Sequence, residues 1–130
     1  MTRADKPVRI GMLGCGVVGS EVARLLLADT EELSTRAGVK IELARIAVRT
    51  IKDYPGINPA LFTTDPFAIV NDPEIDLIVE VMGGIEPANE LAHLAIKNRK
   101  SIVTANKALL ASHGADLFTA AYAKGEDIYY

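Results

Sequence analysis

The sequence predicts an α/β domain built on a doubly wound, mainly parallel sheet with helices on both faces. Three observations support this fold class. Short apolar segments alternate along the chain with segments whose apolar residues have helical spacing. The short segments are apolar almost throughout, which is typical of parallel strands covered on both sides. The chain has 130 residues, which is enough for one domain with one hydrophobic core.

Five strands are expected from the short apolar segments. The first lies at residues 8–13 and stops at glycines, and the second extends over residues 39–48. Two more are expected at residues 76–82 and 101–104, and residues 127–130 have the pattern of a fifth strand that is just beginning. Because parallel strands place their carboxyl ends at one edge of the sheet, a ligand is expected to bind at that edge.

Helices are expected between these strands. Residues 20–28 have a broad apolar face, and this helix is expected to continue toward Thr35 and to end at Gly38. Asp65 is the expected cap of a short helix at residues 67–71, with Pro66 at its first position. Further helices are expected from residue 86 to about residue 99, from 105 to 111, and from 114 to 123 with Gly125 as its end.

The overall composition argues against several classes of protein. The net charge is -3 without a basic run, so a nucleic-acid partner is not expected. No apolar run approaches the roughly 18 residues that span a membrane, and residues 1–7 lack the apolar region of a secretory signal. The single cysteine cannot form an internal disulfide, which suits the cytoplasm. His93 and His113 lack neighbours at metal-ligand spacing, so no metal site is expected.

The first strand is followed by the motif G-x-G-x-x-G, which opens a helix. In such a loop Gly14 permits a tight turn, Gly16 lets the backbone approach a pyrophosphate, and Gly19 lets the helix pack close to the strand. The helix N-terminus then offers N–H groups to the phosphates. This context predicts a Rossmann-type dinucleotide site, although a glycine-rich turn without a ligand is the alternative. The loop residues expected at the cofactor are Gly14, Cys15, Gly16, Val17, Val18 and Gly19.

The end of the second strand carries a cation where dinucleotide-binding domains usually carry an acidic residue. Arg49 occupies this end and Lys52 follows, whereas Glu42 lies too early in the strand. An arginine here can bind a 2′-phosphate through two parallel charged hydrogen bonds. NADP(H) is therefore the favoured cofactor and NAD(H) remains possible, with solvated loop charges as the alternative interpretation of Arg49 and Lys52.

The ends of the next two strands carry further candidate residues for the cofactor site. These are Met82, Gly83 and Gly84 at the end of the third strand and Thr104, Asn106 and Lys107 at the end of the fourth. The two glycines let the backbone approach the nicotinamide side of a cofactor, or form a plain turn. Asn106 can cap the helix that follows. A cation at a helix N-terminus is unfavourable, so Lys107 is predicted to hold a substrate oxygen or to transfer a proton, with a surface lysine as the alternative.

Four segments together resemble the homoserine dehydrogenase family in their order and spacing. They are the glycine loop, Ile46–Arg49, Glu80–Ala88 and Val103–Ala111. The strings G-G-I-E-P and T-A-N-K-A-L-L-A are the most specific, and the resemblance covers essentially the whole chain. It implies an oxidoreductase that interconverts L-homoserine and L-aspartate 4-semialdehyde with NAD(P)(H), on the route to threonine, methionine and isoleucine.

The resemblance also implies residue roles and a domain organisation. Lys107 matches the family's catalytic lysine at the junction of the cofactor and substrate sites, and Arg49 matches a position that contacts the 2′-phosphate in NADP-using members. The family's nucleotide domain is followed by a substrate-binding and dimerisation domain. Residues 1–130 are therefore expected to be an incomplete NAD(P)-binding domain, truncated before the substrate domain. It is expected to bind cofactor without turnover and to come from a homo-oligomeric parent.

Other functions remain open on the residues alone, because nucleotide-binding sheets serve many activities. One is another NAD(P)-dependent semialdehyde or sugar dehydrogenase, which differs in the substrate it accepts. Another is a nucleotide-sensing module, which binds the cofactor without chemistry. A methyltransferase also uses a glycine-rich first loop, but it prefers an acidic residue at the second strand end, so Arg49 argues against it.

Overall fold

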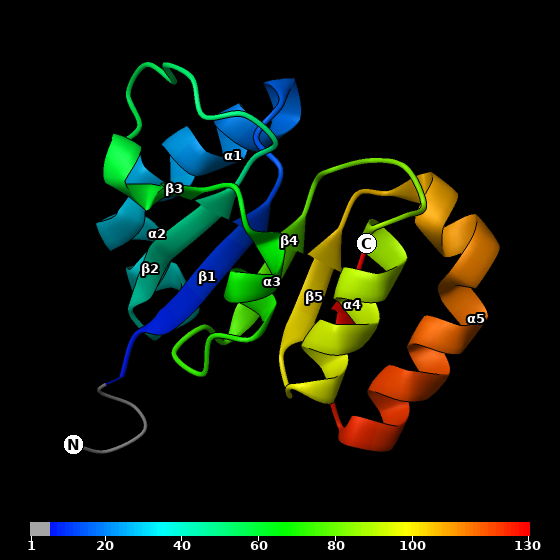
Figure 1. Cartoon of the computed structure of the whole chain (residues 1–130). Helices are drawn as coiled ribbons and strands as arrows, with labels where there is room; N and C mark the ends of the chain where they lie inside the picture. The colour runs from blue at the N-terminus through cyan, green and yellow to red at the C-terminus, as the bar shows by residue number, and fades with distance from the viewer. Residues whose placement is uncertain (1–5) are drawn as a thin grey trace.

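Among the residues that the structure describes, the chain forms one six-stranded sheet in which every neighbouring pair of strands is parallel (Figure 1). This computed structural model describes residues 6–130; residues 1–5, on which part of the expectation about a secretory signal rests, lie outside the described residues. The strand order is β3-β2-β1-β4-β5-β6. The strands are β1 (Val8–Leu13), β2 (Ile41–Ala47), β3 (Phe62–Thr63), β4 (Leu77–Glu80), β5 (Ser101–Thr104) and β6 (Ile128–Tyr129). The predicted doubly wound parallel fold is confirmed.

Helices cover both faces of this sheet. They are α1 (Val17–Ala28), α2 (Thr30–Ala37), the 3-10 turn η2 (Pro59–Leu61), α3 (Pro66–Val70), α4 (Ala88–Lys97) and α5 (Lys107–Lys124). Helices α1 and α2 pack on one face of the sheet against β2. Helices α3 and α4 pack on the opposite face, α3 against β1 and β2 and α4 against β4 and β5, and α5 packs against α4. Between β3 and β4 the chain crosses from one face of the sheet to the other. Strands β2 and β3 therefore lie on one side of β1, and β4, β5 and β6 lie on its other side, so the strand order reverses between β1 and β4. A sheet of this kind binds its ligands at the carboxyl ends beside that reversal.

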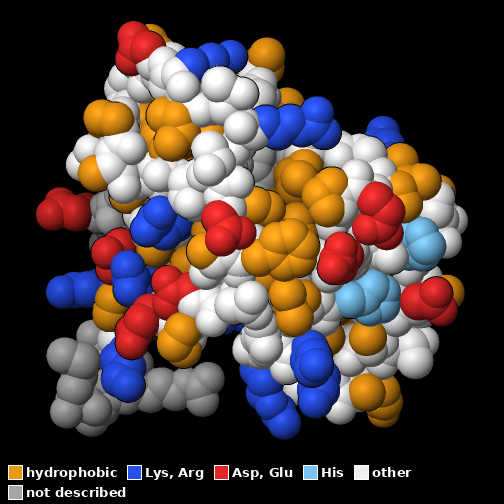
Figure 2. Space-filling model, viewed as in Figure 1, with side chains coloured by type: hydrophobic (Ala, Val, Ile, Leu, Met, Phe, Trp, Pro, Cys, Tyr) orange, Lys and Arg blue, Asp and Glu red, His pale blue; other side chains and the backbone are white. Residues whose placement is uncertain are grey.

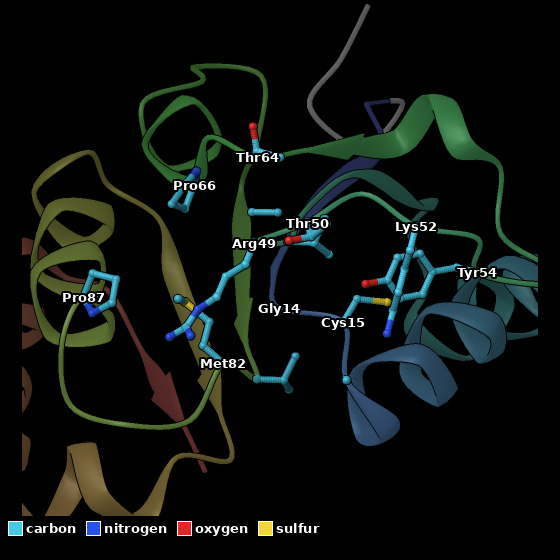
Figure 3. A pocket seen from close by; sticks show the side chains of 14 residues that line it. Gly14, Cys15, Arg49, Thr50, Lys52, Tyr54, Thr64, Pro66, Met82 and Pro87 are labelled. Atoms are coloured by element: carbon cyan, nitrogen blue, oxygen red, sulfur yellow. The ribbon is translucent and has the colours of Figure 1, made fainter.

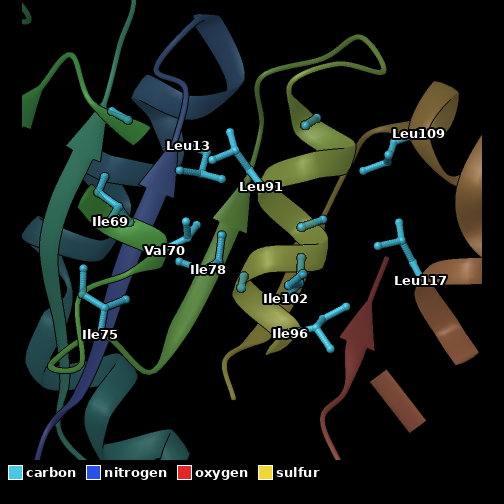
Figure 4. Close-up of a cluster of buried hydrophobic side chains, with 14 of the residues drawn as sticks. Leu13, Ile69, Val70, Ile75, Ile78, Leu91, Ile96, Ile102, Leu109 and Leu117 are labelled. Carbon is cyan, nitrogen blue, oxygen red and sulfur yellow. The ribbon is translucent and has the colours of Figure 1, made fainter. Parts of the chain in front are cut away.

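Strand β1 contributes to a separate core on each face. Ile10 and Met12 pack in the cluster beneath α1, whereas Leu13 belongs to the larger cluster shared with α3, α4 and α5 (Figure 4). Gly11 lies between them and lets α3 approach closely, because a Cβ atom there would lie 2.4 Å from Cγ2 of Ile69. Residues on successive positions of a strand point to opposite faces, which explains this division.

The first helical region differs from its prediction at its start and in its middle. Helix α1 begins at Val17 rather than at Ser20, so the last part of the glycine loop forms its first turn. The predicted continuation toward Thr35 is interrupted at Asp29, whose φ and ψ of -112° and 28° are not helical. The residues beyond form α2, which buries no side chain, so core packing does not hold it in line with α1. The predicted end at Gly38 is confirmed.

Two other predictions need correction, and one is confirmed. The helices expected at 105–111 and 114–123 are a single helix, because α5 buries Leu109, Leu117 and Ala121 on both sides of Gly114. This packing overrides the low helix propensity of glycine. The short strand β3 was not predicted, since two residues cannot display an alternating pattern. Asp65 caps α3 as expected, with its carboxylate accepting from the backbone N–H of Phe67 at 3.0 Å.

No helix among residues 6–130 has the length and apolar character needed to cross a membrane.

Candidate functional site

A groove of about 590 Å³ opens at the carboxyl ends of β1, β2 and β4 (Figure 3). Its walls come from the glycine loop, the end of β2, the segment between β2 and β3, and the first residues after β4. It therefore lies beside the reversal of strand order between β1 and β4, where the fold is expected to bind a ligand. In Figure 2, Lys and Arg side chains are present at the upper edge, toward which the strand arrows of Figure 1 point.

The glycine loop has the three local geometries that its motif predicts. Gly14 has a positive φ of 99°, and a Cβ atom there would lie 3.0 Å from the carbonyl oxygen of Val81. A Cβ on Gly19 would lie 3.1 Å from the carbonyl oxygen of Gly14, so α1 packs tightly on the loop. At Gly16 a Cβ would have no neighbour within 4 Å, which leaves this backbone open toward the groove. The loop thus combines a closed inner side with an open outer side.

Helix α1 begins at the groove with its N-terminus uncapped by any side chain. Gly16 is the N-cap, and no acidic residue lies in the first turn. Val17 and Val18 are 87% and 62% exposed, so they present the start of the helix to solvent. The first N–H groups of a helix have no partner within it, and they carry a partial positive charge. This end of α1 is suited to an anionic group.

The wall of the groove formed by the segment after β2 carries positive charge and an aromatic ring. Arg49 and Lys52 both line the groove and are exposed, and the lining includes no Asp or Glu among the described residues. The ammonium nitrogen of Lys52 lies 5.5 Å from the ring centre of Tyr54, which stacks on Phe62 with ring centres 4.6 Å apart. Burial, and secondarily the nearby Cys15 thiol, raises the pKa of Tyr54. This wall can attract a phosphate and still offer a flat apolar surface.

Some groove residues were not predicted from the sequence. Tyr54 lies in a loop whose prolines and glycine conceal any structural pattern. Thr64 and Pro66 reach the groove because β3 joins the edge of the sheet, and that strand was not predicted. Pro87 also lines the groove, directly before α4. The sequence did contain a signal for Thr64 and Pro66. Both flank Asp65, the predicted cap of α3, and Asp65 lies at the carboxyl edge once β3 is recognised as a strand.

The structure brings together only part of the predicted site. The predicted residues that line the groove are Gly14, Cys15, Gly16, Arg49, Lys52 and Met82. Gly83 and Gly84 follow β4 as exposed residues with φ of 78° and 75°, outside the groove lining. Thr104 is the last residue of β5, the next strand, and Asn106 and Lys107 follow it; all three are also outside the lining. Val17, Val18 and Gly19 form the first turn of α1 and are outside the lining as well. The candidate residues of β5 and α5 thus form a second group, separate from those in the groove.

The second group differs in the exposure of its members. Thr104 and Asn106 are buried, at 4% and 6% exposure, whereas Lys107 is exposed as the first residue of α5. Asn106 caps α5 as predicted, because its Oδ1 accepts from the backbone N–H of Leu109 at 3.0 Å. Lys107 therefore presents an ammonium group at the carboxyl edge of the sheet, beside buried polar side chains. Among residues 6–130 no group of three or more His, Cys, Asp or Glu could hold a metal ion.

Comparison with known proteins identifies a protein family that the chain matches. Residues 14–130 match the family model described as the NAD-binding domain of homoserine dehydrogenase. The homoserine dehydrogenase of Corynebacterium glutamicum is 46% identical over 124 residues, which are 95% of this chain and 28% of that protein. The homoserine dehydrogenase of Pseudomonas aeruginosa is 43% identical over 92% of this chain and 28% of that protein. The chain thus spans about 28% of the length of these curated relatives.

Solved structures agree with this similarity. The crystal structure of a homoserine dehydrogenase from Thiobacillus denitrificans matches 99% of this chain and 30% of that chain, with a TM-score of 0.91 and 44% identity. A hyperthermophilic archaeal homoserine dehydrogenase in complex with NADPH matches 95% of this chain and 43% of that chain, with a TM-score of 0.76. Its identity of 20% means that this second likeness shows the fold alone.

Proposed function

This chain belongs to the homoserine dehydrogenase family, and on that premise we propose that its groove binds NADP(H) in preference to NAD(H). The observation that carries this preference is that two cations, Arg49 and Lys52, line a groove whose described lining residues include no carboxylate. A ribose 2′-phosphate is dianionic or nearly so, and the planar guanidinium of an arginine binds it through two hydrogen bonds. A carboxylate at this place would instead favour the free hydroxyls of NAD(H).

The remaining groups of the groove fit the rest of the dinucleotide. The open backbone at Gly16 leaves room for a pyrophosphate, since a side chain would fill the space in front of it. The uncapped N-terminus of α1 supplies N–H groups to the same phosphates. Tyr54, held against Phe62, offers a flat surface beside the cations. The adenosine half of the cofactor is accordingly assigned to the groove, and the nicotinamide half to the strand ends of β4 and β5.

For the whole protein we propose the interconversion of L-homoserine and L-aspartate 4-semialdehyde. The bound cofactor would supply or accept the hydride. Lys107 would contact the substrate oxygen that gains or loses a proton as the hydride moves, because it is an exposed ammonium group at the nicotinamide end of the site. The 130-residue chain by itself is expected to bind cofactor without turnover, since it spans about 28% of the length of its curated relatives.

The affinity of the chain for NADPH and for NADH, measured by calorimetry, tests the cofactor assignment. We expect NADPH to bind more tightly and the Arg49→Ala variant to lose about tenfold in NADPH affinity, with little change for NADH. Arg45→Ala is the matched control, because Arg45 is an exposed arginine of β2 that does not line the groove. Equal affinities for both cofactors in the unchanged protein, or equal losses in the two variants, would contradict the assignment.

A further inference from the structure

A carboxylate is buried at the end of β4, where the sequence alone assigned no role. Glu80 is only 1% exposed. Its Oε1 accepts a hydrogen bond from the hydroxyl of Thr104 at 2.7 Å, and its Oε2 accepts one from the backbone N–H of Met82 at 2.8 Å. None of the salt bridges among the described residues includes Glu80. A buried charge of this kind is costly unless its hydrogen bonds are made, and here both oxygens are occupied.

The hydrogen bonds continue from Thr104 back to the loop after β4. The Thr104 oxygen accepts from the backbone N–H of Asn106 at 3.0 Å. The amide nitrogen of Asn106 then donates to the carbonyl oxygen of Gly84 at 2.5 Å. Glu80, Thr104 and Asn106, which we call the Glu80 network, therefore bind the loop after β4 at both Met82 and Gly84. One continuous set of bonds joins the ends of β4 and β5.

The geometry of the network explains why a carboxylate is needed at this position. Two donors, the N–H of Met82 and the hydroxyl of Thr104, point at the side chain of residue 80. A glutamine would offer one accepting oxygen and an amide nitrogen that only donates. The Thr104 oxygen would then accept from both Asn106 and the glutamine, and its own buried proton would lose its partner. An unpaired buried donor costs more than an ordinary hydrogen bond contributes, so the carboxylate is the side chain that satisfies the whole network.

We propose that Glu80 is a positioning residue, which acts through Thr104 and Asn106 to hold the nicotinamide end of the site. This inference rests on the proposed function, which places the nicotinamide at the ends of β4 and β5. The network fixes the Gly83–Gly84 backbone on one side. On the other side it fixes Asn106, the cap of α5, and with it the backbone position of Lys107. Because Thr104 and Asn106 are buried, they serve the cofactor through these two neighbours.

Two ligands separate positioning from general loss of structure. NADPH uses both ends of the site, whereas 2′,5′-ADP lacks the nicotinamide and uses only the groove, which the network does not line. Thr104→Val removes the hydroxyl while keeping the shape of the side chain. The matched control is Thr104→Ser, which keeps the hydroxyl. Calorimetry with both ligands on the unchanged chain and on the two variants gives the comparison.

We expect Thr104→Val to weaken NADPH binding about tenfold and to leave 2′,5′-ADP binding within about twofold, because a buried hydrogen-bond network is disrupted at one end only. Thr104→Ser should restore NADPH affinity to within about threefold. Unchanged NADPH binding in Thr104→Val, or equal losses for both ligands, would overturn the proposal. So would an unchanged protein that binds NADPH no more tightly than 2′,5′-ADP. Failure of the unchanged protein to bind either ligand would instead refute the proposed function.

A second variant keeps the test decisive if Thr104→Val does not fold. Asn106→Asp retains an acceptor for the N–H of Leu109, so the cap of α5 is preserved. It replaces the donor to Gly84 with an oxygen and so breaks the network at its other end. The same selective loss of NADPH binding is expected. A loss that is equal for 2′,5′-ADP, or no loss at all, would count against Glu80 as a positioning residue.

Discussion

Glu80 at the carboxyl edge of the sheet and Lys100 at the amino edge are both buried charges, yet they have different surroundings. Lys100 is 3% exposed, and its ammonium group donates to the carbonyl oxygens of Asp72 at 2.6 Å and Ile75 at 2.7 Å. Those carbonyls belong to the connection between α3 and β4, and Lys100 directly precedes β5. Glu80 instead joins two loops beside an open groove.

The comparison of Lys100 with Glu80 distinguishes a buried charge that stabilises the fold from one that organises a binding site, at opposite ends of β4 and β5. Around Lys100 the chain is held by further bonds, such as the one from the Asn98 side chain to the carbonyl oxygen of Val70 at 2.8 Å. Around Glu80 the neighbouring Gly83 and Gly84 are exposed, with no atom within 4 Å of a Cβ placed there. A buried charge can thus stabilise a closed connection or organise an open one. We expect changes at the amino edge to alter the free energy of unfolding and changes at the carboxyl edge to alter cofactor affinity.

The largest expected effect is at the amino edge. Lys100→Met keeps the apolar stem and removes the donors to Asp72 and Ile75. The free energy of unfolding should fall by about 2 kcal/mol, because buried carbonyl groups lose their partner. NADPH affinity should stay within about twofold, since the groove is at the opposite edge. Urea denaturation and calorimetry measure the two quantities.

The control for this variant is Lys97→Met on α4. Lys97 is exposed, so its replacement should change the free energy of unfolding by no more than about 0.5 kcal/mol. A Lys100→Met variant that is as stable as Lys97→Met would show that the carbonyls of Asp72 and Ile75 do not need this donor. A large loss of NADPH affinity would show that the two edges are coupled.

The next prediction concerns the carboxyl edge, where a substitution should lower NADPH affinity and leave the free energy of unfolding nearly unchanged. Gly16→Ala places a methyl group in the open space before the loop, and the backbone at residue 16, with φ of -80°, accepts alanine. NADPH affinity should fall about tenfold because the methyl group occupies the space of the pyrophosphate. The free energy of unfolding should change by less than about 1 kcal/mol. Denaturation and calorimetry on the same samples test this pairing.

Gly114→Ala is the matched glycine replacement. Gly114 lies inside α5, where a Cβ would make ordinary contacts of 3.8 and 3.9 Å, so alanine should stabilise the helix by up to about 1 kcal/mol. NADPH binding should be unchanged. If Gly16→Ala binds NADPH as well as the unchanged chain does, the pyrophosphate does not approach the backbone at Gly16.

The last prediction uses the titration of Lys100. Burial lowers the pKa of Lys100 below its ordinary value of 10.5, and the carboxylates of Asp72 and Asp76 partly oppose this shift. Between the lowered pKa and 10.5 the unfolded state binds more protons than the folded state, so the free energy of unfolding rises with pH. The unchanged chain should therefore gain stability relative to Lys100→Met through this window. Urea titrations of both proteins at rising pH measure the difference, and a constant or falling difference would contradict the assignment.

The candidate site was predictable where a residue type has a local reason for its place. Each of the three loop glycines is required for a steric reason that the motif itself indicates. The structure shows the expected local geometry at Gly14, Gly16 and Gly19. Arg49 and Lys52 could be placed because they follow a recognisable strand. Tyr54 could not, because it lies in a loop without a regular pattern, and Thr64 could not, because it reaches the groove through a two-residue strand with no pattern of its own.

Local sequence patterns are sufficient to predict the α/β alternation, the glycine loop, the cations after β2 and the cap of α5, because each depends on neighbours within a few residues. The contacts of Glu80 with Thr104, 24 positions away, and of Lys100 with Ile75, 25 positions away, depend instead on how the strands pair in the folded sheet. A buried charge is stable only with partners, and the parallel register of β4 and β5 brings those partners to it. That register is a property of the assembled sheet rather than of either strand.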